Sequence, residues 1–271
     1  MDSKKISALL VLLFLFVSCE KVFEFSPYSA YVQSDRRNTT EKNFERISET
    51  ATKPFEPFKI AFISDTHLFY EDLEEAIKQI NQRDDIDFVI HGGDITDMGL
   101  IKEFHIFQDL MKNLNKPYFT VIGNHDCLAN GLFIYREMFG DENYSFVYRD
   151  CKFVFFNDVV WELNYTEPDY AWLAQELRNT PSDIRHTFLI THIPPWTDQF
   201  FLSSFLFFNQ IVTHFNVRMT IHGHNHDPEI YVSNTPELEI APNFVIGSVN
   251  KGMYRTLEIL SDSVHLQSVY F

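Results

Sequence analysis

The sequence has few cysteines, few basic residues and no hydrophobic run long enough to cross a membrane. Three cysteines among 271 residues are too few for a scaffold held together by disulfides. Twenty-two Lys and Arg stand against 38 Asp and Glu, which gives a net charge of -16 and a surface that repels a polyanion. We therefore expect no nucleic-acid polymer as a partner. A phosphate-bearing ligand must be attracted locally, by metal ions or by a few donors aimed at it.

Hydrophobic side chains, in contrast, are plentiful. They make up 45% of the chain, and aromatic residues make up 16%. A chain of this length and composition can bury a sizeable core in one large domain or two small ones. These values exclude a disordered tail or a short linker protein.

The first 19 residues read as an export signal. Two lysines precede a 12-residue apolar run from Ile6 to Val17, whereas a membrane-spanning helix needs about 20 such residues. The ending Phe16-Val17-Ser18-Cys19 resembles a bacterial lipobox, although Leu is more usual at its first position. We therefore expect a lipoprotein signal peptide over residues 1–18 and an exported cell-envelope lipoprotein, periplasmic or surface-facing, held to the membrane by lipid on Cys19. An ordinary signal peptide cleaved nearby is the alternative.

The next segment, residues 19–57, is predicted to be a lipid-anchored tether. It is polar, rich in Ser, Thr, Asn and Arg, and has no sustained apolar period. Four aromatic residues complicate this interpretation, because they could dock part of the segment onto the domain: Phe23, Phe25, Tyr28 and Tyr31.

Residues 58–271 show the alternation of an α/β domain, in which short β-branched and aromatic runs alternate with helical periods. Buried strands are predicted over residues 59–64, 88–91, 118–122, 187–191 and 218–222, and a hairpin over 144–157. Helices are predicted around Leu73 to Ile80, Leu100 to Leu114, from Thr166 onward, and near Ser204 to Phe215. The last 27 or so residues read as three strands without helices, so we expect mixed sheets.

Residue types that bind metals follow five of these strands directly. The candidates are Asp65, His67, Asp94, Asn124, His125, His192, His224 and His226. In open α/β sheets, ligand sites form beyond the carboxyl ends of the strands, so these loops are expected to converge. Glycines at positions 92, 93, 123 and 223 fit tight turns or close backbone approach in the same loops.

The same residues indicate which metals bind and what reaction follows. Carboxylate, imidazole and amide ligands without a thiolate favour Mn, Fe or Zn. About seven ligands exceed the needs of one tetrahedral ion, whereas two ions sharing a carboxylate would use them all. A pair of ions suits in-line displacement at phosphorus, so the sequence predicts metal-assisted hydrolysis of a small phosphoester.

In order along the chain, the motifs D-T-H, G-G-D-I-T-D, G-N-H-D, T-H-I-P-P and G-H-N-H resemble the calcineurin-like metallophosphoesterases over residues 58–271. The resemblance implies an α/β fold: a β-sandwich of two mixed sheets flanked by α-helices, in four layers α/β/β/α. It also implies that Asp65, His67 and His226 hold one metal, that Asp94 bridges, and that Asn124, His192 and His224 hold the second. His125 would stabilise charge on the phosphoryl group or protonate the leaving oxygen, and a metal-bound hydroxide would be the nucleophile.

The stretch from Gly93 to Asp126 is most similar to the branch of bacterial cyclic-nucleotide and glycerophosphodiester phosphodiesterases, which favours a phosphodiester substrate. Asp97 stands where purple acid phosphatases place a tyrosine ligand, so a tyrosinate-to-iron centre is not expected. A phosphomonoesterase or pyrophosphatase with the same metals is the alternative, and would need cations such as Lys251, Arg255 or Arg218 near them. A surface binding lipoprotein with a relic site is a third interpretation, although no ligand is lost.

Several other residues have structural interpretations. Asp97 and Asp126 are expected to support or cap the loops, and His91 and His222 to pack in the core. The aromatic residues around Trp196 to Phe208 either line a pocket or pack a helix against the sheet. Cys127 and Cys151 could pair in an oxidising compartment, but the sequence does not place them within bonding distance. The oligomeric state is not predicted.

Overall fold

The computed structural model describes residues 26–231 and 241–271. The predicted signal peptide, Cys19, Phe23 and Phe25 lie outside the described residues. The helices are α2 (Thr39–Ala51), α3 (Tyr70–Asn81), α4 (Ile101–Met111), α5 (Gly131–Phe139), α6 (Tyr170–Arg178) and α7 (Leu202–His214), with short 3-10 turns at Ser34–Arg36, His125–Cys127 and Val249–Lys251.

Eleven strands of the described residues form two sheets. The first sheet has the order β11 (Val264–Tyr270), β10 (Met253–Ile259), β1 (Phe58–Ile63), β2 (Phe88–His91) and β3 (Tyr118–Thr120). The second has the order β4 (Tyr144–Tyr148), β5 (Cys151–Phe155), β6 (His186–Ile190), β7 (Met219–His222), β9 (Asn243–Val245) and β8 (Glu229–Tyr231). In the first sheet, β1, β2 and β3 are parallel and β10 and β11 add antiparallel to β1. In the second sheet, β5, β6, β7 and β9 are parallel and the edge strands β4 and β8 are antiparallel to them. The mixed sheets predicted from the sequence are confirmed.

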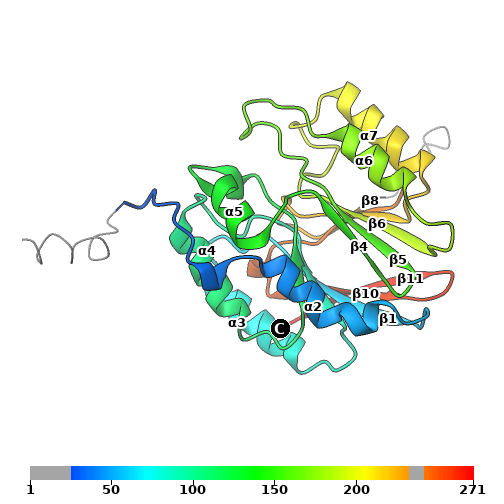
Figure 1. Cartoon of the computed structure of the whole chain (residues 1–271), viewed down its shortest axis with the longest axis horizontal. Coiled ribbons are helices and arrows are strands. Elements are labelled where there is room, and N and C mark those ends of the chain that lie inside the picture. The colour runs from blue at the N-terminus through cyan, green and yellow to red at the C-terminus, as the bar shows by residue number, and fades with distance from the viewer. Residues whose placement is uncertain (1–25, 232–240) are drawn as a thin grey trace, which may run out of the picture.

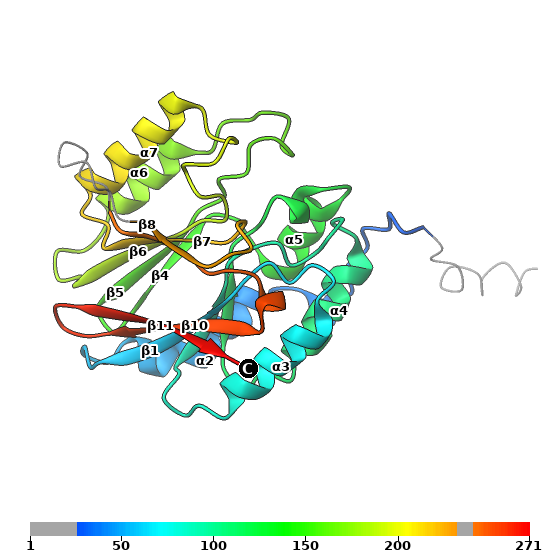
Figure 2. The ribbon, with the colours of Figure 1, turned by 180° about the vertical axis from the view of Figure 1, so that it is seen from behind.

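The two sheets pack face to face, with helices on their outer faces (Figures 1 and 2). One core cluster joins the first sheet to α3, α4 and α5, and another joins the second sheet to α6 and α7. The third cluster fills the space between the sheets and is unusually aromatic, with Phe58, Phe62, Phe88, Phe119, Phe146, Phe153, Phe155, Phe188 and Phe244. This arrangement confirms the four-layer α/β/β/α sandwich.

Local sequence explains several elements directly. In α3, the four buried residues are those at i, i+3, i+4 and i+7: Leu73, Ala76, Ile77 and Ile80. The β4–β5 hairpin turns at Arg149 and Asp150, which both adopt left-handed φ values of 45° and 58°, as a two-residue hairpin turn requires. Helix α6 begins later than the predicted Thr166, because Asp169 caps it by accepting a hydrogen bond from the Trp172 N–H at 2.9 Å.

The prediction of a tether over residues 19–57 is wrong for residues 39–51, which form helix α2. Helix α2 lies inside it and covers the side of the sandwich, where β3 and β4 are the edge strands (Figure 1). The Phe44 ring contacts Phe119 at 5.1 Å and Phe146 at 5.3 Å, and Ile47 is buried in the core between the sheets. An edge strand covered by a helix is protected from pairing with other chains. Docking of this segment therefore occurs, but the side chains of Tyr28 and Tyr31 remain exposed.

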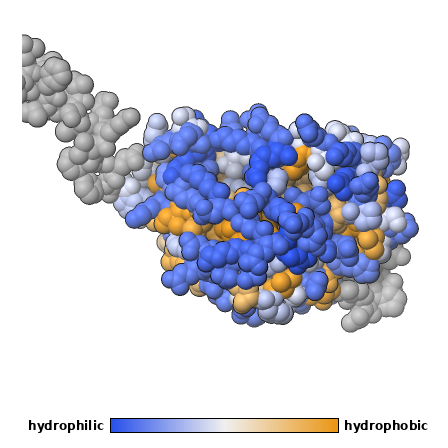
Figure 3. Space-filling view, turned by 90° about the horizontal axis from the view of Figure 1, so that it is seen from below, coloured by the Kyte–Doolittle hydropathy of each residue, from blue (hydrophilic) through white to orange (hydrophobic). Residues whose placement is uncertain are grey.

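The described surface fits the acidic composition. Seen from below, it is mainly hydrophilic, with smaller hydrophobic areas between (Figure 3). Over residues 26–231 and 241–271, none of the helices combines the length and the hydrophobicity that crossing a bilayer demands.

Candidate metal centre

The five loops predicted to converge do so at one edge of the sandwich, beyond the carboxyl ends of the parallel strands. All eight candidate residues meet there. Three groups of residues each bring their ligand atoms within 4.8 Å of one another. They are Asp65, His67 and His226; Asp94, His192 and His224; and His67, Asp97 and His125. The first group is the ligand set expected for one metal, and the second joins the expected bridging residue Asp94 to two of the three ligands expected for the other metal.

The first group combines a carboxylate with two imidazoles. One oxygen of Asp65, Oδ1, accepts a hydrogen bond from the His224 backbone at 3.0 Å and lies 3.9 Å from Nε2 of His226. The His67 ring lies 5.3 Å from the His226 ring, centroid to centroid. His226 is the most open member, with 42% of its side chain exposed, so the first site faces solvent on that side.

Asp94 lies between the two groups. Its Oδ2 is 3.6 Å from Nε2 of His67 and 3.2 Å from Nε2 of His192, while its Oδ1 accepts a hydrogen bond from the His125 backbone at 2.9 Å. One carboxylate oxygen therefore faces a histidine from each group. This is the position that a bridging ligand must occupy.

The second group adds an amide oxygen to two imidazoles. Oδ1 of Asn124 lies 3.2 Å from Nε2 of His192 and 3.1 Å from Nδ1 of His224. The other nitrogen of His192, Nδ1, donates to the Gly92 carbonyl at 2.7 Å, which leaves Nε2 to face Asp94 and Asn124. A histidine whose second nitrogen is held by a carbonyl is typical of metal ligands.

The backbone of these loops is strained where the ligands lie. Asp65, His67, Asp94 and His224 all have left-handed φ values, between 43° and 65°. Such values are uncommon for residues other than glycine and cluster at functional sites. Gly123 is required for a different reason: a Cβ there would collide with the backbone nitrogen and side chain of Asp94.

Several buried polar atoms in the described residues lack any hydrogen-bond partner. They include Oδ2 of Asp65 and both ring nitrogens of His67. A buried donor or acceptor without a hydrogen-bond partner costs about 1–3 kcal/mol of folding free energy, so unpaired polar atoms are rare in the cores of native proteins. Orphaned oxygen and nitrogen atoms facing a common space are what a cation needs as ligands. The donor set therefore fits metal ions of the Mn, Fe or Zn type.

The pKa shifts agree with this fit. Burial lowers the pKa values of His67, His224 and His226, so these imidazoles stay neutral, as metal ligands must. Burial also acts to lower the pKa of His192, but the charge of Asp94 and their hydrogen bond outweigh it and raise the pKa to about 10. In the metal-free protein His192 is therefore a cation beside Asp94, and metal binding must displace its proton.

His125 stands next to both groups without belonging to the expected ligand set. Its Nδ1 donates to the Asp97 carbonyl at 2.7 Å, and its ring lies 4.6 Å from that of His67. Burial acts to lower the pKa of His125, but Asp94 and the Asp97 carbonyl outweigh it, so the pKa is raised. Nε2 of His125, which has no hydrogen-bond partner among the described residues, can therefore carry a proton toward a bound ligand. The Asp97 carboxylate is also close enough to be a ligand, 3.6 Å from Nδ1 of His67.

The hydrogen bonds show the roles of Asp126, which was predicted to support the loops, and of His91 and His222, which were predicted to pack in the core. Asp126 accepts backbone hydrogen bonds from Ile95, Thr96 and Gly123 at 2.9–3.1 Å, and so ties two ligand loops together. His91 and His222 are fully buried core residues, as expected, and each bonds a threonine hydroxyl at 2.8 Å, Thr66 for His91 and Thr191 for His222.

Two acidic residues near the centre were missed by sequence reasoning, and both follow β5. Asp158 accepts from the backbone N–H of His192 and of Ile193, each at 3.1 Å. Glu162 accepts from Nδ2 of Asn124 at 2.9 Å. Asp158 stands just beyond a strand end, which is the signal that identified the other loops. Glu162 carries no comparable signal.

The remaining predictions concern residues beside the centre. Cys127 and Cys151 are both free and lie in different core clusters, so they form no disulfide. Phe208, on α7, packs in the core between that helix and the second sheet, whereas Phe201 and Phe207 are exposed. Trp196 stacks on Tyr231 at 5.0 Å.

Comparison with solved structures supports the fold. A purple acid phosphatase from yellow lupin seeds superposes with a TM-score of 0.62 at 15% identity, over 81% of this chain and 53% of that one. GAP50, the anchor in the inner membrane complex of Plasmodium, superposes with a TM-score of 0.57 at 12% identity, over 79% of this chain and 84% of that one.

Curated relatives are similar in sequence. A protein named as a probable glycerophosphodiester phosphodiesterase of Arcobacter nitrofigilis is 28% identical over 154 residues, which are 49% of this chain and 56% of the relative. A 3′,5′-cyclic-nucleotide phosphodiesterase of Nostoc sp. is 25% identical over 197 residues, which are 63% of this chain and 72% of the relative. This chain thus spans about half the length of the first relative. The family model for calcineurin-like phosphoesterases matches residues 58–228, and the chain belongs to that family.

Proposed function

We propose that this protein hydrolyses a small phosphodiester with two divalent metal ions. The observation that carries the proposal is the pair of ligand groups on either side of Asp94, whose Oδ2 faces His67 on one side and His192 on the other. One ion would be held by Asp65, His67 and His226, and the other by Asn124, His192 and His224, with Asp94 shared. Mn, Fe or Zn suits these ligands.

When bound, the ions would polarise the phosphoryl oxygens and lower the pKa of a water molecule. The chain's own residues would do the rest. His125, held by the Asp97 carbonyl, would keep a proton on Nε2 beside the phosphoryl group. That proton can stabilise negative charge in the transition state or pass to the leaving oxygen. Asp126 and Asp158 would hold the ligand loops in place through their backbone hydrogen bonds.

A diester is favoured over a monoester because the candidate cations are paired or buried. Lys251 pairs with Asp227 at 2.7 Å, Arg218 donates to the Asp262 carbonyl at 3.2 Å, and Arg255 is buried against the Phe244 ring. Two of the three are thus paired and the third is buried, which leaves little positive charge to balance the second charge of a monoester dianion. The two curated relatives, both named as phosphodiesterases, support the same preference.

We also propose that the protein is exported and lipid-anchored, on the basis of the apolar run before Cys19. Replacing Cys19 with Ser should abolish labelling by a radioactive fatty acid and release the protein from the membrane fraction. Unchanged labelling would contradict the anchor.

The test of the reaction uses protein stripped of metal and reloaded with Mn, Fe or Zn. Hydrolysis of a bis-aryl phosphodiester is compared with hydrolysis of the matching aryl phosphomonoester. We expect faster cleavage of the diester. Faster cleavage of the monoester would favour the phosphatase alternative, and absence of turnover with two ions bound would favour a binding protein with a relic site.

A further inference from the structure

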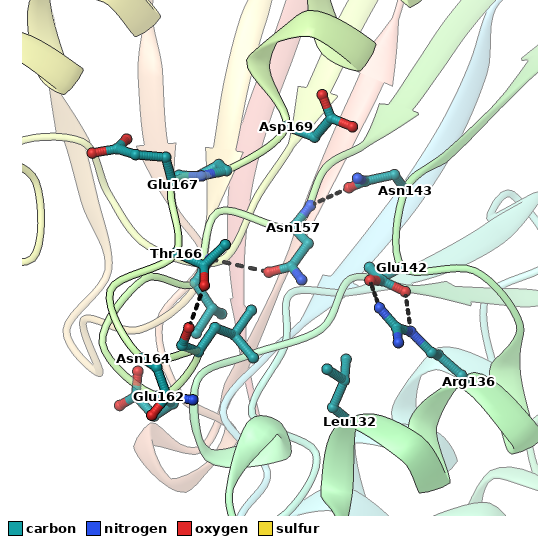
Figure 4. A pocket seen from close by; sticks show the side chains of 13 residues that line it. Leu132, Arg136, Glu142, Asn143, Asn157, Glu162, Asn164, Thr166, Glu167 and Asp169 are labelled. Carbon is teal, nitrogen blue, oxygen red and sulfur yellow. Dashed lines mark hydrogen bonds and ion pairs between the residues drawn. The ribbon is translucent and has the colours of Figure 1, made fainter.

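One carboxylate reaches the second metal site from a loop that carries none of the predicted ligands. Glu162 lies between β5 and α6 and lines a cavity of about 340 Å³ beside the centre. Figure 4 shows Glu162 next to Asn164 at one side of this cavity, away from the Arg136–Glu142 ion pair on the other side. The contact that matters is between Oε1 of Glu162 and Nδ2 of Asn124, at 2.9 Å.

This contact determines which way the Asn124 amide points. An asparagine side chain can present either its oxygen or its nitrogen to a given neighbour, and the two ends are nearly equal in size. An ionised carboxylate only accepts hydrogen bonds, so the end of Asn124 that faces Glu162 must be the NH₂ group. The oxygen is then left toward His192 and His224, at 3.2 and 3.1 Å from their ring nitrogens. That is the end a metal ion requires.

The loop that carries Glu162 is well held. Val159 and Val160 anchor it in the core, and the Val160 carbonyl accepts hydrogen bonds from the backbone of Leu163 at 3.2 Å and of Tyr165 at 2.9 Å. The same loop begins at Asp158, which binds the backbone of His192. Glu162 therefore approaches Asn124 from a closed turn that is tied to the metal centre at its other end.

The Glu162 carboxylate has no other hydrogen bond among the described residues than the one to Asn124. Its second oxygen, Oε2, is buried and has no hydrogen-bond partner among the described residues. Arg136, the cation of the cavity wall, donates to both oxygens of Glu142. The charge of Glu162 is thus directed at the Asn124 amide, and a hydrogen bond to a charged acceptor is stronger than one between neutral groups.

We propose that Glu162 is a positioning residue, which fixes the Asn124 amide with its oxygen toward the second metal ion. The inference rests on the proposed function, because it takes Asn124 as a ligand of that ion. Outer hydrogen-bond partners of metal ligands are worth roughly 10–100-fold in metal affinity or activity. The effect should fall on one of the two ions, because Glu162 contacts no residue of the Asp65, His67 and His226 group in the described structure.

Three variants separate the possible causes. Glu162→Ala removes the acceptor, Glu162→Gln keeps an acceptor oxygen but removes the charge, and Glu167→Ala removes a carboxylate from the same cavity wall without touching Asn124. Binding of Mn²⁺ to metal-free protein is followed by calorimetry. We expect Glu162→Ala to weaken one of two binding steps by about 10–100-fold and kcat to fall with it. Glu162→Gln should lose less than about tenfold, the lower end of that range, and Glu167→Ala should match the wild type.

A second readout needs neither metal nor substrate. In the metal-free protein, the hydrogen bond to Glu162 should move the side-chain NH₂ resonance of Asn124 downfield in a ¹H–¹⁵N spectrum. This resonance should shift upfield in Glu162→Ala and stay in place in Glu167→Ala. An unchanged resonance, or equal losses of Mn²⁺ affinity in Glu162→Ala and Glu162→Gln, would overturn the inference. Wild-type protein that binds two ions without hydrolysing any phosphoester would contradict the proposed function alone, since the resonance still reports on Glu162.

Discussion

The space between the two sheets and the metal edge are both buried, but they differ in how complete their contacts are. Between the sheets, the Phe153 ring contacts Phe88, Phe146 and Phe188 at centroid distances of 5.2–5.4 Å. At the metal edge, Asp65 and His67 are as fully buried as many core residues, yet keep polar atoms without partners. Their backbones are also left-handed, whereas the parallel strands that lead to them are regular.

The core between the sheets contributes stability, whereas the metal edge contributes ligands. The aromatic core is stabilised by hydrophobic burial and ring contacts among its own side chains, without a ligand. The metal edge is stable only because that core holds strained loops and crowded carboxylates in place. Substitutions in the two regions should therefore separate activity from stability.

His125→Ala should lower kcat by about 10²–10⁴-fold, the usual contribution of a positioned acid or base. The protein should fold normally and bind the same number of metal ions, because His125 is outside the two proposed ligand groups. Steady-state kinetics on a bis-aryl phosphodiester, beside thermal unfolding, checks both parts. The exposed His265 offers a matched control, and His265→Ala should leave kcat unchanged. Wild-type turnover in His125→Ala would remove this residue from the mechanism.

Phe153→Ala should do the opposite. Removing a ring from the centre of the aromatic core costs about 3–5 kcal/mol in the free energy of unfolding. The fraction that remains folded should still bind metal and should keep its kcat. Urea unfolding measures the loss, and Val147→Ala, on the exposed face of the neighbouring strand, should change stability by less than about 0.5 kcal/mol. A loss of metal ions from folded Phe153→Ala would show that the two regions are not separable.

Raising the pH above about 7 should lower the free energy of unfolding of the metal-free protein. Burial raises the pKa of Asp65 to about 7, so the folded chain keeps a proton there that the unfolded chain releases near pH 4. His192, with a pKa raised to about 10, also holds its proton longer when folded than when unfolded. Below about pH 6.5 the histidines with lowered pKa values bind fewer protons in the folded state and oppose Asp65, whereas above about pH 7 they are neutral in both states. The free energy of unfolding should therefore fall as the pH rises from about 7 to 10, where His192 keeps its proton in the folded state. Thermal unfolding with a chelator and with saturating Mn²⁺ should diverge most at the alkaline end. Parallel pH profiles for the two samples would argue against a metal at these residues.

Asn43→Ala should have the smallest effect of the set, and it tests whether α2 belongs to the folded domain. The buried Asn43 side chain accepts a hydrogen bond from the Tyr118 backbone at 3.2 Å and donates to the Thr39 carbonyl at 3.0 Å. Leaving the Tyr118 N–H unpaired should cost about 1–3 kcal/mol. The exposed Glu49 on the same helix is the control. Equal stabilities of Asn43→Ala and Glu49→Ala would mean that α2 is only loosely attached.

The ligand positions were predictable because they follow strands directly. Asp65, Asp94 and His192 each come within a few residues of a short apolar run, and the topology of the sheets then brings them together. Asp158 carries the same signal after β5, but its strand belongs to a hairpin, and the alternating pattern of the hairpin predicts a turn at Arg149 rather than a ligand loop. Glu162 lies seven residues past the strand, and only the folded turn reveals its contact with Asn124.

The helix α2 was missed for a different physical reason. Its buried positions include Thr39, Thr40 and Asn43, so the apolar period that identifies a helix is weak in the sequence. The side of the sandwich that it covers is itself formed by two strands distant in sequence, β3 and β4. Pairing polar residues with a particular strand edge is a tertiary property, which no local pattern predicts.

The most direct test of a two-ion centre is a metal count on folded protein. Wild type and Asp94→Asn are stripped of metal, reloaded with Mn²⁺ and freed of excess ions. The manganese bound per chain is then measured by inductively coupled plasma mass spectrometry. We expect two ions per wild-type chain and fewer than two in Asp94→Asn, because the side chain shared between the groups loses its charge. One ion or none in the wild type, or two in both proteins, would contradict a centre built around Asp94.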